Sequence, residues 1–233
     1  MNIIIRDANG KQDRSIPISK DMQQHFSIPI NHANTILDQI NSGMYAKWFE
    51  GKKDLVCIDI GANVGLVSLY MLPACKELYC IEPTPSHFKL LKELLGEHTN
   101  THLHSLALAD KNGEVIFMTG HSTENKITSA DGYGNGKIKV TSVTLSGLLQ
   151  VTGADRFIID FCKIDIESGE MIALTVSELK KVKGKIKTFF VEVHPGFNGG
   201  MDGNREELKK RFKEAGYKVY EEDYQTIVAT YDC

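Results

Sequence analysis

The chain has 233 residues, enough for one large domain with a well-buried core. Hydrophobic residues make up 42% of it and charged residues 24%, which is ordinary for a globular protein. A net charge of -3 and a pI near 6.2 argue against a general attraction to nucleic acid or to anionic membranes.

The cysteines and the apolar stretches of the sequence indicate the cellular compartment of the protein. The five cysteines include no C-x-x-C pair, so neither a zinc site nor a disulfide framework is indicated. The opening MNIIIR is too short and too quickly charged for a signal peptide, and no apolar stretch is long enough to span a membrane. We therefore expect a protein of the reducing cytoplasm.

The first fifty residues are polar and irregular, with a helix-like piece that ends in ILDQINSGMYAKWF. We expect residues 1–50 to form an extension or lid that packs on the main domain, residues 51–233. In that domain short apolar runs alternate with helical patterns, which is typical of an α/β fold with a parallel sheet and crossover helices. Strands are expected at 55–60, 77–82, 102–107, 158–166 and 187–193, with a closing pair near 217–222 and 225–231.

Capping residues in the sequence indicate where the helices between these strands begin. Thr84 is a candidate N-cap for the helix PSHFKLLKELLG. Asn204 with Glu207 resembles a capping box at the start of the helix REELKKRFKEAG. The segment 108–157 is an insertion, in which we expect a two-stranded piece (EVIFM and KIKVTS) and a short helix that begins at Thr144.

The stretch CIDIGANVGL, residues 57–66, places an acidic residue and glycines at the end of an apolar strand. Such a turn presents backbone N–H groups to a ligand. The dinucleotide pattern G-x-G-x-x-G is absent, because Asp59 stands where its first glycine would be and is followed by Gly61, Asn63 and Gly65. Asparagine tolerates the left-handed backbone of a middle glycine. An aspartate here would repel a pyrophosphate but suits a cationic group.

A second acidic residue, Glu82, ends the next expected strand in YCIEP. A carboxylate in this place can accept hydrogen bonds from both hydroxyls of a ribose. An α-amino group near Asp59 and an adenosine ribose on Glu82 together describe S-adenosylmethionine. Each acid alone is weak evidence, but the pair at this spacing predicts that cofactor.

At these segments the sequence resembles the FkbM-type branch of the class I S-adenosylmethionine-dependent methyltransferases. The resemblance covers most of residues 40–195 and runs through VCIDIGANVGLVSLYM, YCIEPTPSHFKLLKELL, LHSLALADKNGEVIFM, KVTSVTLSGLL, FCKIDIESGEMIAL and FFVEVHP. It implies a Rossmann-like, mostly parallel sheet of seven strands with the last strand antiparallel and helices on both faces. It also implies methyl transfer, usually to a hydroxyl oxygen.

The resemblance further implies a set of cofactor-binding residues. Those that line the methionine part would be Asp59, Gly61, Ala62, Asn63 and Gly65. Glu82 would hold the ribose, with Pro83 beside it in the cofactor site, and Leu106 and Ala107 would flank the adenine.

Two departures from the family pattern stand out. The family often has D-x-E-G-x-E where residues 165–170 read DIESGE, so that the glycine comes one place later. The displaced glycine affects which backbone conformation we expect near the acceptor pocket. The family also often has T-L-D where residues 144–146 read TLS, which concerns a helix start.

Charged residues gather at the ends of the fourth and fifth expected strands. Because side chains alternate across a strand, Lys163, Asp165 and Glu167 share one face, and Glu192 and His194 share a face of the next strand. If the two strands are neighbours, charges of both signs meet at the sheet edge where α/β proteins bind ligands. Lys163 is expected to be neutralised by Glu192 or Asp165, because an unpaired buried charge is too costly.

A neutral hydroxyl acceptor must lose its proton, so a base near the methyl group is expected. His194 and Asp165 are the candidates, with Lys163 and Glu167 orienting them. Asp165 is also expected to bind the cofactor, because it sits at the strand end that faces it. A histidine with its ordinary pKa would make the rate fall in mildly acidic solution. A divalent metal on Asp165, Glu192 and His194 is a weaker alternative, because Lys163 would compete for the same oxygens, and we predict no metal site.

The activity that we expect is O-methylation of a hydroxyl on a small molecule, a sugar or a lipid-linked glycan, with no nucleic-acid partner. A glycine-rich loop, residues 194–204, is expected to cover the acceptor. One alternative is an NAD-dependent oxidoreductase with the same fold, against which Asp59 counts. The other is a regulatory module that binds S-adenosylmethionine without turnover, which the shifted glycine at residue 169 leaves open.

Overall fold

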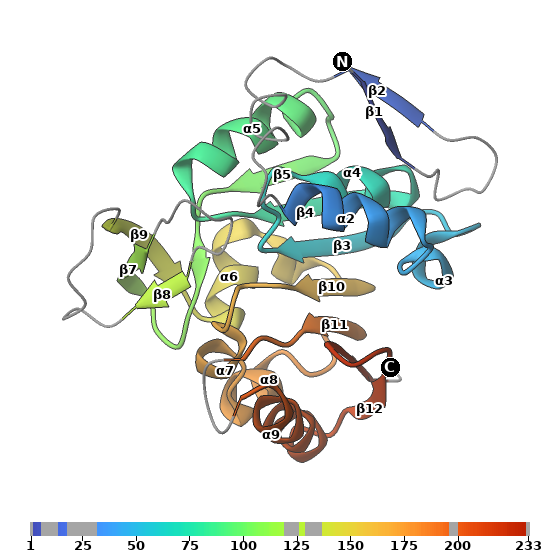
Figure 1. The fold of residues 1–233 in the computed structure, drawn as a ribbon. Coiled ribbons are helices and arrows are strands. Elements are labelled where there is room, and N and C mark those ends of the chain that lie inside the picture. The colour runs from blue at the N-terminus through green and yellow to red at the C-terminus, as the bar shows by residue number, and fades with distance from the viewer. Residues whose placement is uncertain are drawn as a thin grey trace.

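The computed structural model describes residues 2–5, 14–17, 32–118, 126–128, 137–195 and 200–231. Seven strands of this part form one sheet (Figure 1). Across the sheet they lie in the order β12 (Lys218–Glu221), β13 (Thr226–Thr230), β11 (Thr188–Glu192), β10 (Phe161–Ile164), β3 (Leu55–Ile60), β4 (Cys75–Ile81) and β5 (Thr101–His104).

The strand directions confirm the predicted fold class. β13 is antiparallel to both of its neighbours, β11 and β12, and the other pairs of the sheet are parallel. The chain runs outward from β3 through β4 to β5 and then returns to the other side of β3 with β10. The order therefore reverses between β3 and β10, and ligands of open α/β sheets bind at such a point, outside the carboxyl ends of the strands.

Helices cover both faces of this sheet, as predicted (Figure 1). One face packs against α2 (His32–Asn41), α3 (Ala46–Phe49), α4 (Leu66–Met71) and α5 (Pro85–Leu95). The other packs against α6 (Leu145–Thr152), α7 (Glu170–Ala173), α8 (Val176–Lys181) and α9 (Met201–Glu214). Neighbouring strand residues alternate between the two cores: Phe161 and Phe190 belong to the first, Cys162 and Phe189 to the second.

The end of the N-terminal fifty residues contributes to the first core. Tyr45 and Phe49 are almost completely buried. The ring of Tyr45 lies 5.2 Å from that of Phe190, and the ring of Phe49 lies 4.9 Å from that of Phe161. Ahead of this segment, β1 (Asn2–Ile5) and β2 (Arg14–Pro17) form an antiparallel pair. In the described part of the chain, no helix is both long and apolar enough to cross a membrane.

A smaller sheet stands beside the main one and begins where β5 ends. Its order is β6 (Ala107–Leu108), β9 (Lys137–Val143), β7 (Gly113–Met118) and β8 (Lys126–Thr128). The predicted two-stranded piece is therefore wrong in extent, since β7 and β9 pair as expected but two short strands flank them. The predicted strand 102–107 is also wrong, because it divides between the two sheets.

Other element ends follow the sequence signals only in part. α5 begins at Pro85 after Thr84, but the Thr84 side chain makes no cap hydrogen bond. α6 begins as predicted, with the hydroxyl of Thr144 accepting from the backbone N–H of Gly147 at 3.2 Å. Asn204 is no N-cap, because α9 already begins at Met201. Asn204 is fully buried in the helix, and its side-chain amide donates to the carbonyl of His194 at 2.6 Å.

Gly61 follows β3 at the point where the sheet order reverses. Its φ is +80°, and a Cβ on it would lie 1.7 Å from the carbonyl oxygen of Asp165. Gly184 has the same φ of +80°, but nothing lies within 4 Å of its Cβ position. Both glycines therefore need a left-handed backbone, but only at Gly61 would a side chain also collide with a neighbouring atom.

This difference gives a matched pair of variants. Gly184→Ala should lower the free energy of unfolding by about 1–3 kcal/mol, the cost of a left-handed alanine. Gly61→Ala should cost at least about 1–3 kcal/mol more, because the strand ends must also move apart. Urea unfolding of both proteins measures this. Equal losses would show that the contact between Gly61 and Asp165 does not matter for stability.

Candidate active site

The turn after β3 has the backbone that its glycines and asparagine predict. Gly61 and Gly65 have φ angles of +80° and +95°, and Asn63 has φ +52°. The N–H groups of Gly61 and Ala62 both donate to the carbonyl of Ile81 at the end of β4. The turn is therefore tied to the neighbouring strand, directly beside Glu82.

Glu82 is a buried carboxylate that two backbone N–H groups hold in place. Its Oε1 accepts from the N–H of Thr84 at 2.7 Å, and its Oε2 accepts from the N–H of Asn63 at 2.9 Å. Burial raises the pKa of Glu82 to about 7, although the hydrogen bonds from Thr84 and Asn63 oppose the shift. The orientation of this carboxylate is thus fixed before any ligand arrives, and its charge depends on pH near neutrality.

A pocket lies in front of these groups and encloses about 560 Å³ of empty space, part of it open to solvent. The pocket is lined by Ile60, Gly61, Asn63, Glu82, Pro83, Thr84, His87, Leu106, Ala107, Leu108, Phe117, Asp165, Ile166 and Glu167.

Most of the predicted site residues meet in this pocket. Those that line it are Gly61, Asn63, Glu82, Pro83, Leu106, Ala107, Asp165 and Glu167. The predicted residues that are not part of its wall are Asp59, Ala62, Gly65, Lys163 and His194.

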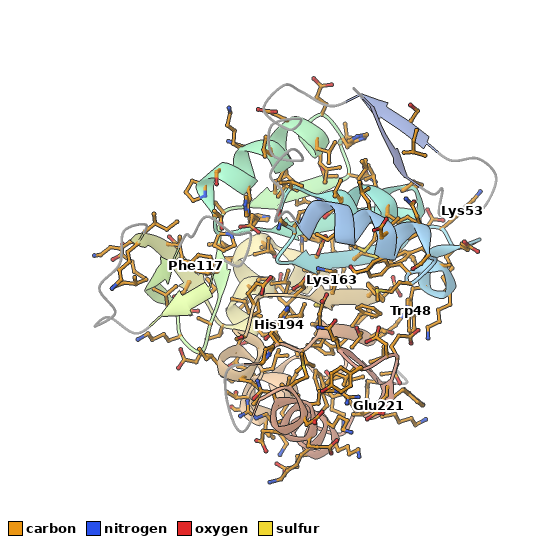
Figure 2. The ribbon with its side chains drawn as sticks, viewed as in Figure 1. Trp48, Lys53, Phe117, Lys163, His194 and Glu221 are labelled. Carbon is orange, nitrogen blue, oxygen red and sulfur yellow. The ribbon has the colours of Figure 1, made fainter. Side chains whose placement is uncertain are left out.

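Six wall residues were not predicted from the sequence: Ile60, Thr84, His87, Leu108, Phe117 and Ile166. His87 is buried in the first turn of α5, with Nδ1 3.8 Å from Oε1 of Glu82. Its place so soon after Glu82 was a signal that could have been used. Phe117 comes from the smaller sheet, and nothing in the local sequence indicated that this sheet reaches the pocket (Figure 2).

Asp59 is completely buried, and its carboxylate contacts other side chains of the protein. Its Oδ2 accepts from the hydroxyl of Ser68 at 2.6 Å. Its Oδ1 lies 3.6 Å from the ammonium nitrogen of Lys163, the residue opposite Asp59 on the neighbouring strand. Asp59 therefore contacts the lysine rather than the pocket.

Lys163 is a buried cation between two strand ends. Its Nζ donates to Oδ2 of Asp165 at 3.0 Å, which confirms the predicted pair, and Asp59 is a second partner that was not predicted. Burial lowers the pKa of Lys163, but Asp165 and Asp59 outweigh burial and hold the pKa well above its ordinary value. Glu192 lies farther along the same face, where burial and then repulsion by Asp165 raise its pKa to about 7.

His194 lies among three carboxylates. Nδ1 is 3.1 Å from Oε1 of Glu170, and Nε2 is 3.7 Å from Oδ1 of Asp165 and 3.6 Å from Oε2 of Glu167. Burial lowers the pKa of His194, but the hydrogen bond to Glu170 and the charges of Glu170, Asp165 and Glu167 raise it to about 10. The imidazole is therefore protonated in neutral solution. Its surroundings do not support the predicted role as base, nor the predicted fall of the rate in mildly acidic solution.

Lys163 and His194 are labelled near the centre of Figure 2, and Asp165 connects them. One oxygen of Asp165 faces the lysine and the other faces the histidine. Behind the pocket, charges of both signs therefore meet at the ends of β3, β10 and β11.

Residues 59–219, more than half of the chain, match the family model of the methyltransferase FkbM domain. The chain belongs to the FkbM methyltransferase family. It is therefore a methyltransferase with S-adenosylmethionine as its cofactor. A search of curated proteins gives no match.

Solved structures that are similar to this FkbM methyltransferase include the following three. Precorrin-6y C5,15-methyltransferase from Geobacter metallireducens is 12% identical, with a TM-score of 0.49 over 91% of this chain and 92% of that one. Methanococcus jannaschii fibrillarin is 13% identical, with a TM-score of 0.48 over 77% and 67%. Magnesium protoporphyrin IX methyltransferase from Synechocystis is 9% identical, with a TM-score of 0.43 over 91% and 84%. Likenesses this distant carry no argument about the acceptor.

The departure from the FkbM-type pattern at residues 165–170 has a local explanation. Ser168, where the family often has glycine, has φ +76°, and Glu167 before it has φ +52°. The turn is therefore left-handed at Glu167 and Ser168, although neither residue is a glycine. The hydroxyl of Ser168 donates to the carbonyl of Pro195 at 2.5 Å, which ties the strained turn to the residue after His194.

We predict that cofactor binding depends on pH through Glu82, whose pKa burial raises to about 7. A protonated Glu82 has one acceptor oxygen fewer for ribose hydroxyls, so binding should weaken as the pH falls through about 7. Calorimetry with S-adenosylhomocysteine should show a dissociation constant at least about threefold higher at pH 6 than at pH 8. Glu82→Gln should bind about 10-fold more weakly at pH 8, with a smaller change between the two pH values. An equal pH dependence in both proteins would assign the effect to another group.

Proposed function

We propose that this FkbM methyltransferase transfers the methyl group of S-adenosylmethionine to a hydroxyl oxygen of a small molecule, a sugar or a lipid-linked glycan. The observation that carries the proposal is that two carboxylates, Asp165 and Glu167, line the same pocket as Glu82. A neutral hydroxyl needs a group that receives its proton, and acidic side chains at the reacting end of the pocket meet that need.

The residues of the pocket fit the cofactor. Each oxygen of Glu82 accepts one backbone N–H, and the Thr84 side chain is a further donor to this carboxylate. A carboxylate has about four acceptor positions, so one remains for a ribose hydroxyl. The apolar side chains of Leu106, Ala107, Leu108 and Phe117 offer a surface for the adenine ring. The turn from Gly61 to Asn63 would meet the methionine part. When bound, S-adenosylmethionine supplies an electrophilic methyl group.

Asp59 takes a different role in this proposal from the one expected of it. It is bonded to Ser68 and faces Lys163, so we assign to it the placing of that lysine rather than direct contact with an α-amino group. Lys163 in turn holds one oxygen of Asp165, a residue of the pocket wall. Asp59, acting through Lys163, would thus fix the position of Asp165 relative to the cofactor.

Asp165 and Glu167 would hold the acceptor. A hydroxyl that donates to either carboxylate is oriented toward the methyl group, and such positioning can supply roughly 7–11 kcal/mol of the barrier. The carboxylate then receives the hydroxyl proton, which contributes about 10²–10⁴-fold. The imidazolium of His194 holds the two carboxylates together and does not itself take the proton.

Two further expectations remain part of the proposal. We assign residues 1–50 to an extension that packs on the methyltransferase domain, since Tyr45 and Phe49 fill space against β10 and β11. We also place the protein in the cytoplasm, where its four described cysteines, all buried and free, would stay reduced. Residues 196–199 of the loop expected to cover the acceptor lie outside the described residues.

The test is methyl transfer to fractionated extract of the source, with S-adenosylmethionine labelled in the methyl group. We expect one labelled product whose label resists mild base, as a methyl ether does. Asp165→Asn should lower the rate at least about 100-fold with little change in the dissociation constant of S-adenosylhomocysteine. Glu114→Gln, on the exposed side of the smaller sheet, serves as the control and should keep the full rate.

Two outcomes would contradict the proposal. A label on nitrogen or carbon would reject the hydroxyl acceptor. Tight binding of S-adenosylhomocysteine without transfer to any fraction would favour a binding module without turnover.

A further inference from the structure

We propose that Asp165, Glu167 and His194 form a binding site for a divalent cation of the Mg²⁺ and Mn²⁺ class. The site deepens the proposed function, since its place at the acceptor end of the pocket rests on that function. Its existence does not, because it follows from the geometry of three side chains on two neighbouring strands.

The candidate ligand atoms have a suitable spacing. Nε2 of His194 lies 3.7 Å from Oδ1 of Asp165 and 3.6 Å from Oε2 of Glu167, and three such atoms lie within 4.8 Å of one another. Oxygen and nitrogen ligands bind divalent cations at about 2.0–2.6 Å, so two ligands of one cation are roughly 3–4 Å apart. Small side-chain movements would bring all three atoms into contact with a single cation, which would displace the proton that Nε2 of the His194 imidazolium carries in the absence of a metal.

Glu170 orients the histidine as a metal ligand would be oriented. This carboxylate is completely buried and accepts at Oε1 from the backbone N–H of Ile166 at 2.9 Å. The same oxygen faces Nδ1 of His194 at 3.1 Å, so that Nε2 is turned toward the two other carboxylates. A histidine that donates one ring N–H to a carboxylate and presents its other nitrogen is the usual arrangement at metal sites.

A second observation points to a missing positive charge. Oε2 of Glu170 is buried and has no hydrogen-bond partner in the described part of the chain. Asp59, Asp165, Glu167, Glu170 and Glu192 gather at these strand ends, where Lys163 and the imidazolium of His194 are the positive groups among the described residues. A bound divalent cation would offset this excess of negative charge.

The expected competition from Lys163 does not arise, because Asp165 uses its two oxygens in different directions. Oδ2 bonds to Lys163, while Oδ1 faces His194. The third ligand is Glu167 rather than Glu192, and the strained turn at Glu167 and Ser168 is what brings it there. Two carboxylates and one imidazole suit a cation such as Mn²⁺, with coordination positions left for oxygen atoms of the acceptor.

The test measures Mn²⁺ binding to the full chain after treatment with a chelator, by the loss of the free-ion signal in electron paramagnetic resonance. We expect one Mn²⁺ per chain and a nitrogen coupling from the imidazole. His194→Gln should remove that coupling, and His194→Gln and Glu167→Gln should each weaken binding at least about 10-fold. His102→Gln serves as the control, because His102 pairs with a single carboxylate, Glu77, at 2.6 Å, away from the site.

Folding of each variant is checked by its retained binding of S-adenosylhomocysteine. Absence of Mn²⁺ binding by the wild type at millimolar concentration would overturn the proposal, and so would equal binding by wild type and His194→Gln. Turnover is not part of this readout. A failure to find a hydroxyl acceptor would therefore reject the proposed function and leave the metal site standing.

Discussion

The buried ammonium of Lys163 between Asp59 and Asp165 is the interaction on which the site depends. The three residues sit at the ends of β3 and β10, where the strand order reverses. Without the lysine, two carboxylates would lie side by side in a region of low dielectric, which is costly. With it, the two strand ends are fixed relative to each other, and the pocket forms in front of them.

Two consequences follow from this fixed spacing. The turn after β3 passes so close to β10 that only glycine fits at position 61, against the carbonyl of Asp165. The second oxygen of Asp165, Oδ1, faces His194 instead of Lys163. In the function proposed above, this one carboxylate connects the cofactor side of the pocket with the acceptor side.

The sequence predicts the residues that are fixed by backbone chemistry better than those fixed by packing. The acid–glycine turn and the neighbouring Glu82 could be found because strand ends and left-handed positions leave local signals. Phe117 and the four-stranded accessory sheet could not, because their place depends on contacts between segments far apart in the chain. The same is true of His194, whose protonation is set by carboxylates from a different strand and a different helix. Asn204 shows the converse, since a plausible cap is used instead to bind a strand end.

A double-mutant cycle on Lys163 and Asp165 tests the central claim most directly. We predict that Lys163→Met alone lowers the free energy of unfolding by roughly 3–5 kcal/mol, because it leaves buried carboxylates uncompensated. Asp165→Asn in the same chain should restore part of this loss, so that urea unfolding gives a coupling of about 1–3 kcal/mol between the two changes. Losses that add within about 0.5 kcal/mol would contradict the claim that this buried pair holds the two strand ends together.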